Sequence, residues 1–246
     1  MALRSEQRLD IAPDWLPDDT EESVLGSEWH QEAIHILADM LRDVALKRGV
    51  SWGIYEQVEL RGVRRQNGRP YPLRPDVFVI GRQLDPTHDI RAVGLADVGA
   101  PLFVAEVSSR STVRNDIDGK AEVYGRIGVP EYLVFDPTKD ILGMHIRAWR
   151  LDPHRQGRYQ PWVADEDGYW RSDILGVSLR PQPHYVSMRD VDGEDIGLPV
   201  ENGERARAAE RALREAQETT RRLEEEIRRM RARFITENPA EDQGKL

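Results

Sequence analysis

Glu106 is an acidic residue at a position where a buried core favours an apolar side chain. It lies in PLFVAEVSS, whose β-branched and aromatic residues predict a strand buried on both faces. A carboxylate buried there is unfavourable unless a cation or hydrogen-bond donors meet it. Strand alternation places Ser108 on the same face as Glu106. The alternative is that Glu106 ends the strand in solvent or in a structural ion pair.

Asp76 is a second such acid, because it follows Pro75 at the start of the strand-like segment DVFVI. Acids at the ends of neighbouring strands can share one hard cation. Magnesium, with manganese as its substitute, prefers oxygen ligands and keeps several waters. Asp76, Glu106 and the backbone carbonyl of Val107 therefore suffice as its protein ligands. The alternative for Asp76 is an ordinary turn aspartate.

Lys120 is the third candidate catalytic residue. Residues 116–127 show a helical pattern that stops at Gly128, and Lys120 falls within its inward stripe of Ile117, Ala121 and Tyr124. An ammonium there can approach the two carboxylates, orient or help to deprotonate a water, and offset charge on a pentavalent phosphate. The alternative is a pair with Asp116, with the lysine stem reaching solvent.

Two further groups could contribute. His30 lies on the apolar stripe of the first predicted helix, where a lone histidine is more often a core residue than a ligand or a base; His35 lies on another face, which excludes a metal pair. Arginines in RGVRRQNGRPYPLRPD lead into Asp76 and are candidate contacts to a DNA backbone: Arg64, Arg65, Arg69 and Arg74. A solvated hairpin turn around Asn67-Gly68 is the alternative for that stretch.

The elements that must position these residues form an α/β core. A helix is expected from the N-cap Ser27 to about Lys47, ended by Gly49. Strands at 102–108 and 131–136 with the helix between them predict a right-handed βαβ unit. Further strands are expected as antiparallel additions at one edge, in HIRAWRL, in GRYQPWV and around Val177–Leu179.

The chain is expected to have five parts. They are an N-terminal extension that wraps loosely on the surface (1–26), the core (27–190), an acidic linker (191–203), a coiled-coil helix (204–235) and a disordered tail (236–246). The linker contains DVDGED, whose glycine has the wrong offset for a calcium loop. Apolar residues at spacings of three and four make a heptad seam from Ala206 to Phe234 and predict a homodimer or docking to a partner. A solitary charged helix is the alternative.

Composition bounds the class of protein. With no cysteine among 246 residues, disulfides, zinc–thiolate sites and thiol nucleophiles are excluded. No segment has the apolar length of a membrane span or a signal core, so we expect a cytoplasmic protein. The net charge of −9 argues against coating nucleic acid through bulk electrostatics but is compatible with a nuclease. P-loop, dinucleotide-binding, HExxH and GxSxG motifs are all missing from the sequence.

The segments RPDVFVIG, PLFVAEVSSRST and DIDGKAEVYGRIGVPEYLVFDP resemble the Uma-type family of restriction endonucleases, a branch of the PD-(D/E)XK nuclease superfamily. The resemblance covers roughly Ser27 to Leu179. It implies a restriction-endonuclease-like mixed central sheet flanked by helices, with a coiled-coil tail. It also implies Asp76 and Glu106 as metal-binding acids and Lys120 as their basic partner. Tyr124 and His30 match a family tyrosine and a family histidine.

One departure from the superfamily pattern concerns the lysine. The usual lysine position, two residues after the glutamate, is Ser108 here, so the resemblance implies that the lysine has moved to the helix. The hypothesis that follows is a magnesium-dependent endonuclease acting on DNA. The rival hypothesis is a catalytically quiet protein of the same fold that binds nucleic acid or acts through its coiled coil.

Overall fold

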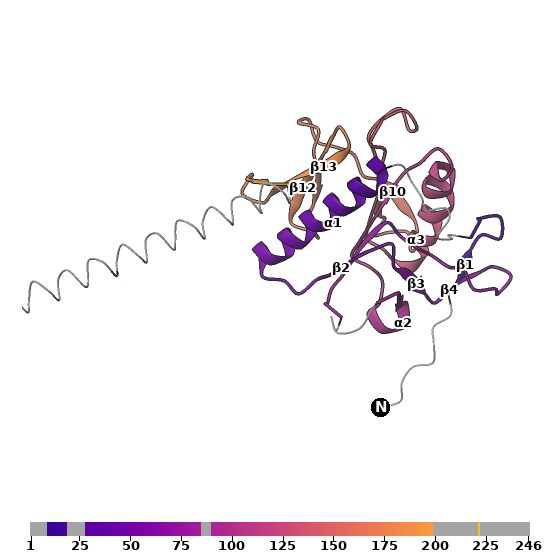
Figure 1. The fold of residues 1–246 in the computed structure, drawn as a ribbon. Coiled ribbons are helices and arrows are strands. Elements are labelled where there is room, and N and C mark those ends of the chain that lie inside the picture. The colour runs from indigo at the N-terminus through magenta and orange to yellow at the C-terminus, as the bar shows by residue number, and fades with distance from the viewer. Residues whose placement is uncertain (1–8, 19–27, 85–89, 199–220, 222–246) are drawn as a thin grey trace, which may run out of the picture. The chain divides into compact units, whose positions relative to one another are not determined.

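The computed structural model describes residues 9–18, 28–84, 90–198 and 221 (Figure 1). The chain divides into two compact units, Met1–Gly197 and Leu198–Leu246. Almost all of the described residues belong to the first unit. The predicted coiled-coil helix, 204–235, and the predicted tail lie outside the described residues apart from residue 221.

A mixed six-stranded sheet forms the centre of the first unit. Among the described residues its order is β10-β9-β8-β7-β5-β2, and only β7 and β8 are parallel neighbours. The strands are β2 (Gly53–Glu56), β5 (Val77–Ile80), β7 (Phe103–Val107), β8 (Glu131–Phe135), β9 (Ile146–Leu151) and β10 (Tyr159–Pro161). Every residue of β5, β7 and β8 is buried, as their nearly continuous apolar sequences predict. The expected α/β class with a mixed sheet is therefore confirmed.

The predicted βαβ unit is present at the middle of this sheet. β7 and β8 are parallel, with Phe103 opposite Glu131, and the chain between them contains a helical segment. That segment has two parts, the π-helix η2 (Asn115–Lys120) and the α-helix α3 (Ala121–Ile127). Gly128 ends α3 in the left-handed conformation, with φ of 94°.

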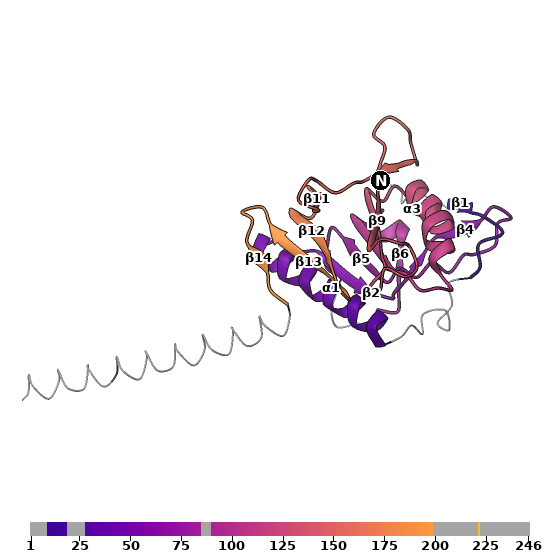
Figure 2. The ribbon, with the colours of Figure 1, turned by 90° about the horizontal axis from the view of Figure 1, so that it is seen from above.

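Two helices cover opposite faces of the sheet (Figure 2). α1 (Glu28–Arg48) buries its predicted apolar stripe of Ala33, Ile34, Leu37, Met40, Leu41 and Val44. α3 lies over the other face, where Tyr124 and Tyr132 pack with Phe78 and Val104. α1 ends before Gly49, whose φ is 63°. Its predicted N-cap, Ser27, lies outside the described residues.

A second sheet changes the expected arrangement of the C-terminal strands. β9 and β10 are antiparallel additions at one edge, as predicted, but Val177–Leu179 belongs to a separate antiparallel sheet in the order β11-β12-β13-β14. Its strands are β11 (Trp170–Ser172), β12 (Val177–Gln182), β13 (Tyr185–Asp190) and β14 (Asp195–Ile196). β13 and β14 pack on α1, so this helix is covered on two sides. The prediction that Val177–Leu179 joins the edge of the central sheet was wrong, because the alternation of apolar and polar residues predicts a strand but does not indicate which sheet it joins.

The predicted acidic linker begins too early. Residues 191–194 form the turn between β13 and β14, where Gly193 N donates to Asp190 O at 3.1 Å. The Asp190 carboxylate also accepts from the backbone N–H groups of Asp192 and Glu194. DVDGED is therefore a hairpin turn of the folded unit, and Ile196 after it is buried. Acidic turns and acidic linkers have the same composition, and this similarity explains the error.

The N-terminal segment was also placed wrongly on the surface. β1 (Leu9–Ala12) pairs in parallel with β4 (Val63–Arg65), and Ala12 and Leu16 are almost fully buried. Arg65 fixes the segment by donating to the carbonyl oxygens of Pro13 and Leu16. The acidic and proline-bearing composition hid these few apolar anchors.

The remaining elements form a short parallel pair beside the main sheet. β3 (Glu59–Arg61) pairs with β6 (Ala92–Gly94), and the one-turn helix α2 (Leu95–Val98) follows. Within the described residues, no helix is both long and apolar enough to cross a membrane.

Asp136 fixes the loop that leaves the carboxyl end of β8. Its side chain is fully buried and accepts hydrogen bonds from the backbone N–H groups of Thr138, Lys139, Ile141 and Leu142. Burial by itself raises the pKa of this carboxyl, but the hydrogen bonds from Leu142, Ile141 and Thr138 outweigh burial and leave the pKa below its usual value.

Asp136→Asn should therefore destabilise the protein by about 2 kcal/mol at pH 7, because the ionised acceptor is lost. A lowered pKa stabilises the fold above the ordinary aspartate pKa, and this stabilisation disappears as pH falls through the folded-state pKa. Urea unfolding at several pH values should show the difference between variant and wild type shrinking below about pH 4. Asp140→Asn, at an exposed residue of the same loop, is the control. A deficit that stays constant down to pH 3 would contradict this account.

Candidate active site

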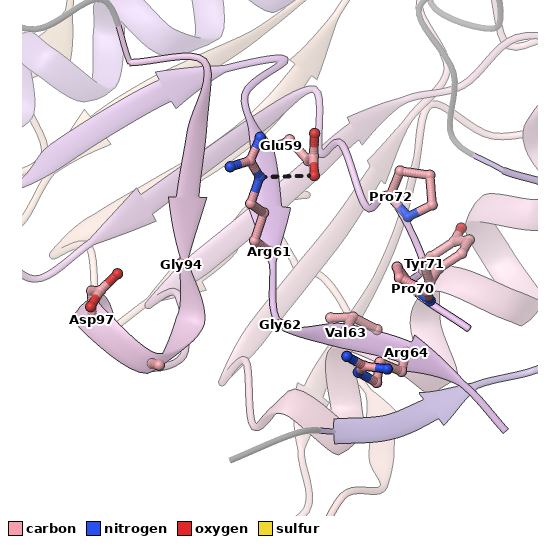
Figure 3. Close-up of a pocket in the computed structure, with 11 residues that line it drawn as sticks. Glu59, Arg61, Gly62, Val63, Arg64, Pro70, Tyr71, Pro72, Gly94 and Asp97 are labelled. Atoms are coloured by element: carbon pink, nitrogen blue, oxygen red, sulfur yellow. Dashed lines mark hydrogen bonds and ion pairs between the residues drawn. The ribbon is translucent and has the colours of Figure 1, made fainter. Parts of the chain in front are cut away.

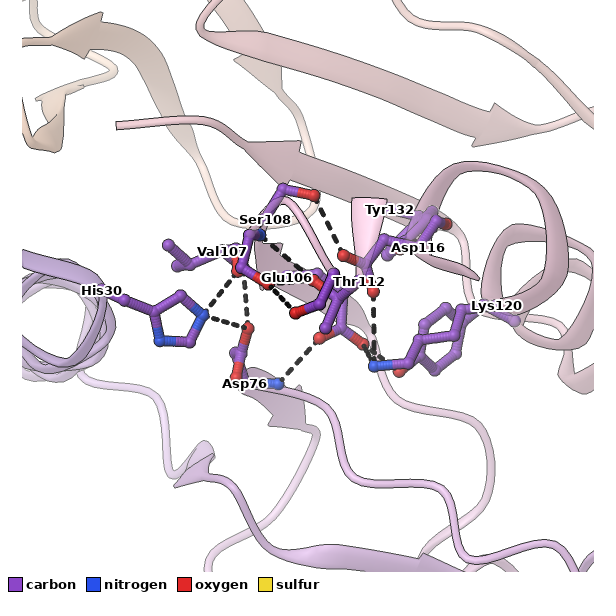
Figure 4. Close-up of polar contacts among 12 residues, drawn as sticks. His30, Asp76, Glu106, Val107, Ser108, Thr112, Asp116, Lys120 and Tyr132 are labelled. Carbon is purple, nitrogen blue, oxygen red and sulfur yellow. Dashed lines mark hydrogen bonds and ion pairs between the residues drawn. The ribbon is translucent and has the colours of Figure 1, made fainter. Parts of the chain in front are cut away.

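Strand register brings the two predicted acids together. β5 and β7 are antiparallel with Val77 opposite Ala105, so the start of β5 meets the end of β7. Asp76 N donates to Glu106 Oε2 at 3.3 Å, and Val107 N donates to Asp76 Oδ2 at 2.8 Å. Asp76 is 7% exposed and Glu106 is 2% exposed. Both carboxylates therefore lie in a shielded position at one end of the sheet (Figure 4).

Lys120 reaches the same carboxylates from the helical segment. Its Nζ lies 3.1 Å from Glu106 Oε1 and 3.5 Å from Asp116 Oδ1. The lysine is 5% exposed, so its stem does not extend into solvent as in the alternative interpretation. One turn later, Tyr124 Oη donates to Glu106 Oε1 at 2.6 Å. Asp76, Glu106, Lys120 and Tyr124 thus converge on one buried cluster.

The backbone that carries Lys120 is a π-helix and not the regular α-helix that its periodicity predicted. Residues 115–120 make this wider turn, and Asp116, Gly119 and Lys120 are its buried residues. Single π-turns within helices are often found at functional sites. A Cβ at Gly119 would clash with the Leu16 side chain, so a larger residue would require the packing of the N-terminal segment to shift.

Asp116 is a member of the cluster that the sequence analysis treated only as a pairing partner of Lys120. Ser108 Oγ donates to its Oδ2 at 3.0 Å, and Tyr132 Oη donates to its backbone oxygen at 2.9 Å. Burial raises the pKa of Asp116, and the nearby charge of Asp76 raises it further, while Lys120 opposes both effects. Its spacing of four residues before Lys120 was the available signal.

His30 approaches the cluster from α1, on the opposite face of the sheet. Its Nε2 lies 2.6 Å from Val107 O and 3.7 Å from Asp76 Oδ2. Its Nδ1 is buried without a hydrogen-bond partner among the described residues. The predicted carbonyl ligand of Val107 and the predicted acid Asp76 therefore face the same ring nitrogen. His35 instead bonds to Glu56 Oε2, so the two histidines are separate, as expected.

The chemistry of the cluster suits a hard divalent cation. Asp76, Glu106 and Asp116 can carry three negative charges, which the single ammonium of Lys120 does not balance. Buried surplus charge is unfavourable and attracts either protons or a cation. No group of three or more His, Cys, Asp or Glu in the described part of the chain is arranged to hold a metal ion. Magnesium does not require such a group of three side chains, since it usually binds through one or two carboxylates and retains several water ligands.

The predicted DNA-contacting arginines do not join this cluster as a set. Arg64 donates to Gly68 O at 2.8 Å, and Arg65 holds the N-terminal segment. The turn at Asn67-Gly68 is present, with Arg65 N bonded to Arg69 O at 2.7 Å, as the alternative interpretation stated. Arg69 is exposed, and Arg74 lies 3.8 Å from Glu59. Their contact with DNA stays a prediction.

The raised pKa of Asp116 makes stability depend on pH. A raised folded-state pKa stabilises the fold at low pH, and this contribution is lost as pH rises from about 4 through the folded-state value. Asp116→Asn should therefore gain stability relative to wild type between pH 4 and pH 8, in urea unfolding. Asp118→Asn, at an exposed residue of the same turn, is the control. A relative stability that falls over this range would show that Lys120 outweighs burial.

Comparison with known proteins identifies the family. The family model described as "Uma2: Putative restriction endonuclease" matches residues 7–180, more than two thirds of the chain. The match includes β1, which the resemblance from Ser27 onward left out. A similar solved structure, a "putative nuclease belonging to DUF820" from Anabaena variabilis, has 11% identity and a TM-score of 0.44, over 61% of this chain and 75% of that chain. No curated protein matches. From the family match, the chain belongs to the Uma2 family.

Proposed function

We propose that this protein is a metal-dependent endonuclease that hydrolyses phosphodiester bonds in DNA. The observation that carries the proposal is the convergence of Asp76, Glu106 and Lys120, with Lys120 Nζ 3.1 Å from Glu106 Oε1 and Asp76 N 3.3 Å from Glu106 Oε2. The Uma2 family description, "Putative restriction endonuclease", supports the same reaction class. Fold membership alone does not give an activity, so the test is on the residues.

The proposed cofactor is Mg²⁺, with Mn²⁺ as its substitute. Asp76, Glu106 and the Val107 carbonyl would hold it, and all three supply the oxygen atoms that this ion prefers. When bound, such an ion lowers the pKa of water and neutralises charge on a phosphate. His30 would orient the Val107 carbonyl through the contact of 2.6 Å.

The chain's own residues have separate tasks in the proposed reaction. Lys120 would offset the negative charge that develops on the phosphate and orient the attacking water. Tyr124 would hold Glu106 in place by donating to Oε1, an oxygen that Lys120 also contacts. The water oxygen forms a bond to phosphorus as the bond to the leaving deoxyribose oxygen breaks, and the water gives up one proton to solvent. The leaving oxygen then takes up a proton from solvent.

Asp76→Asn and Glu106→Gln should each lower nicking of supercoiled plasmid on the order of 100-fold, because each removes a charged ligand without changing side-chain shape. Calorimetry should show weaker Mg²⁺ binding in both variants. Lys120→Met should lose nicking to a similar degree while it still binds Mg²⁺.

Matched controls separate this loss from misfolding. Glu122→Gln changes a half-exposed glutamate on α3, and Lys47→Met changes a half-exposed lysine on α1. Both should cut like wild type, and all variants should keep the wild-type circular dichroism spectrum. Unchanged nicking in both Asp76→Asn and Glu106→Gln would refute the proposed site. A wild-type chain that neither binds Mg²⁺ nor cuts with either metal would favour the catalytically quiet alternative.

We also propose that the chain forms a homodimer through the heptad seam of residues 204–235. Truncation after Asn202 should then convert a dimer into a monomer in light scattering coupled to size-exclusion chromatography. The control is Met230→Leu, which keeps an apolar residue in the seam and should leave the dimer intact. A full chain that elutes as a monomer at micromolar concentration would contradict this assembly.

A further inference from the structure

A hollow of about 480 Å³ lies beside the start of β5, next to Asp76. Polar side chains make up much of its lining, chiefly Gln57, Glu59, Arg61, Arg74 and Arg91. Gln57 N donates to the backbone oxygen of Asp76 at 3.1 Å. The hollow is therefore adjacent to the candidate active site, since Gln57 is hydrogen-bonded to the backbone of Asp76. The side chains that line the hollow are different from those of the active-site cluster.

Gln57 has two unfavourable features at this position. Its φ of 52° lies in the left-handed region, which residues other than glycine rarely adopt. Its amide Nε2 is buried and has no hydrogen-bond partner among the described residues. A strained backbone and an unsatisfied buried donor at a single residue indicate a position maintained for binding. The missing partner must be an acceptor, since an amide nitrogen only donates.

The charges around Gln57 favour a negatively charged acceptor. Arg61 Nε lies 3.2 Å from Glu59 Oε1, and Arg74 Nη2 lies 3.8 Å from Glu59 Oε2, so one glutamate holds two guanidinium groups. Arg91 adds a third positive charge to the lining. The other acid of the hollow, Glu56, already pairs with Arg42 at 2.6 Å. With three arginines and two glutamates, the lining carries one more positive than negative charge, in a chain whose net charge is −9.

A second groove of about 700 Å³ adjoins the hollow and shares Glu59 and Arg61 with it (Figure 3). Arg64 also lines this groove. Arginines therefore line both sites: Arg61 and Arg64 line the groove, and Arg61, Arg74 and Arg91 line the hollow. A chain with a phosphate at every nucleotide can contact such a series, whereas a single small anion would occupy only one position.

We propose that the hollow at Gln57 binds a phosphate group of the nucleic-acid strand, next to the phosphate that is cut. The Gln57 amide donates to a phosphate oxygen, and Arg74 and Arg91 supply the positive charge. Assignment of this phosphate to a substrate strand rests on the proposed function, but a phosphate-binding site at Gln57 does not.

The first test is a titration of the full chain with inorganic phosphate, followed by the side-chain amide signals of Gln57 in ¹⁵N–¹H spectra. These signals are assigned as the pair that disappears in Gln57→Ala. They should shift in a saturable way, and the affinity should fall roughly tenfold in Arg91→Ala. Arg171→Ala, at an exposed arginine paired with Asp173, should leave the affinity unchanged. Gln57 signals that do not move, or that move equally in Arg91→Ala, would overturn the proposal.

The second test measures binding of a labelled DNA oligonucleotide in EDTA, where no cleavage occurs. Gln57→Ala should weaken binding roughly tenfold without changing its salt dependence, because a neutral donor is lost. Arg91→Ala should also make the salt dependence shallower by about one unit. Alanine tolerates the φ of Gln57 no better than glutamine does, so thermal unfolding should be similar to wild type.

The two proposals can fail separately. A wild-type chain that cuts DNA while its Gln57 signals ignore phosphate, and whose Gln57→Ala variant binds DNA normally, would overturn this inference alone. A wild-type chain that binds phosphate at Gln57 but cuts no DNA with Mg²⁺ or Mn²⁺ would overturn the proposed function and support the phosphate site.

Discussion

The burial of the Glu106 carboxylate is the constraint on which the rest of the site depends. Glu106 is 2% exposed in the central strand of the sheet, where an isolated charge would be strongly unfavourable. Three groups from different segments meet it: the backbone N–H of Asp76, the ammonium of Lys120 and the hydroxyl of Tyr124. Each partner requires a particular element in a particular place. The register of β5, the π-turn of η2 and the start of α3 are all consistent with this one requirement.

The packing that supplies donors to Glu106 also brings two further acids, Asp76 and Asp116, into the same region. Burial raises the pKa of the Asp116 carboxyl, and the negative charge of Asp76 raises it further, while the ammonium of Lys120 opposes both effects. Under the proposed function, the buried negative charge that disfavours folding would also favour binding of Mg²⁺, so stability and function would oppose each other at this site.

The surrounding architecture explains why these groups hold their positions. α1 and α3 cover opposite faces of the sheet. α1 carries His30, and η2, which leads into α3, carries Lys120, and both side chains reach the same end of β7. The N-terminal segment presses Leu16 against Gly119 of the π-helix, so residues far from the site in sequence support it. Next to Asp76, the hollow at Gln57 is lined by three arginines, of which Arg61 and Arg74 pair with Glu59. The two proposals thus assign the binding of a cation and the binding of a phosphate to adjacent regions.

The sequence by itself determined the local helices and strands and identified the charged residues that occupy apolar positions within them. Apolar runs predicted β5, β7 and β8, and the helical stripe predicted that Lys120 points inward, because these depend on short-range periodicity. It did not determine that η2 is a π-helix, that β12 joins a second sheet, or that Ala12 and Leu16 enter the core. These outcomes depend on long-range pairing. Likewise, Asp76 and Glu106 are separated by 30 positions, and only antiparallel register places them in contact. Gln57 could not be recognised at all from sequence, since its strained φ and unpaired amide exist only once β2, β3 and β5 have packed together.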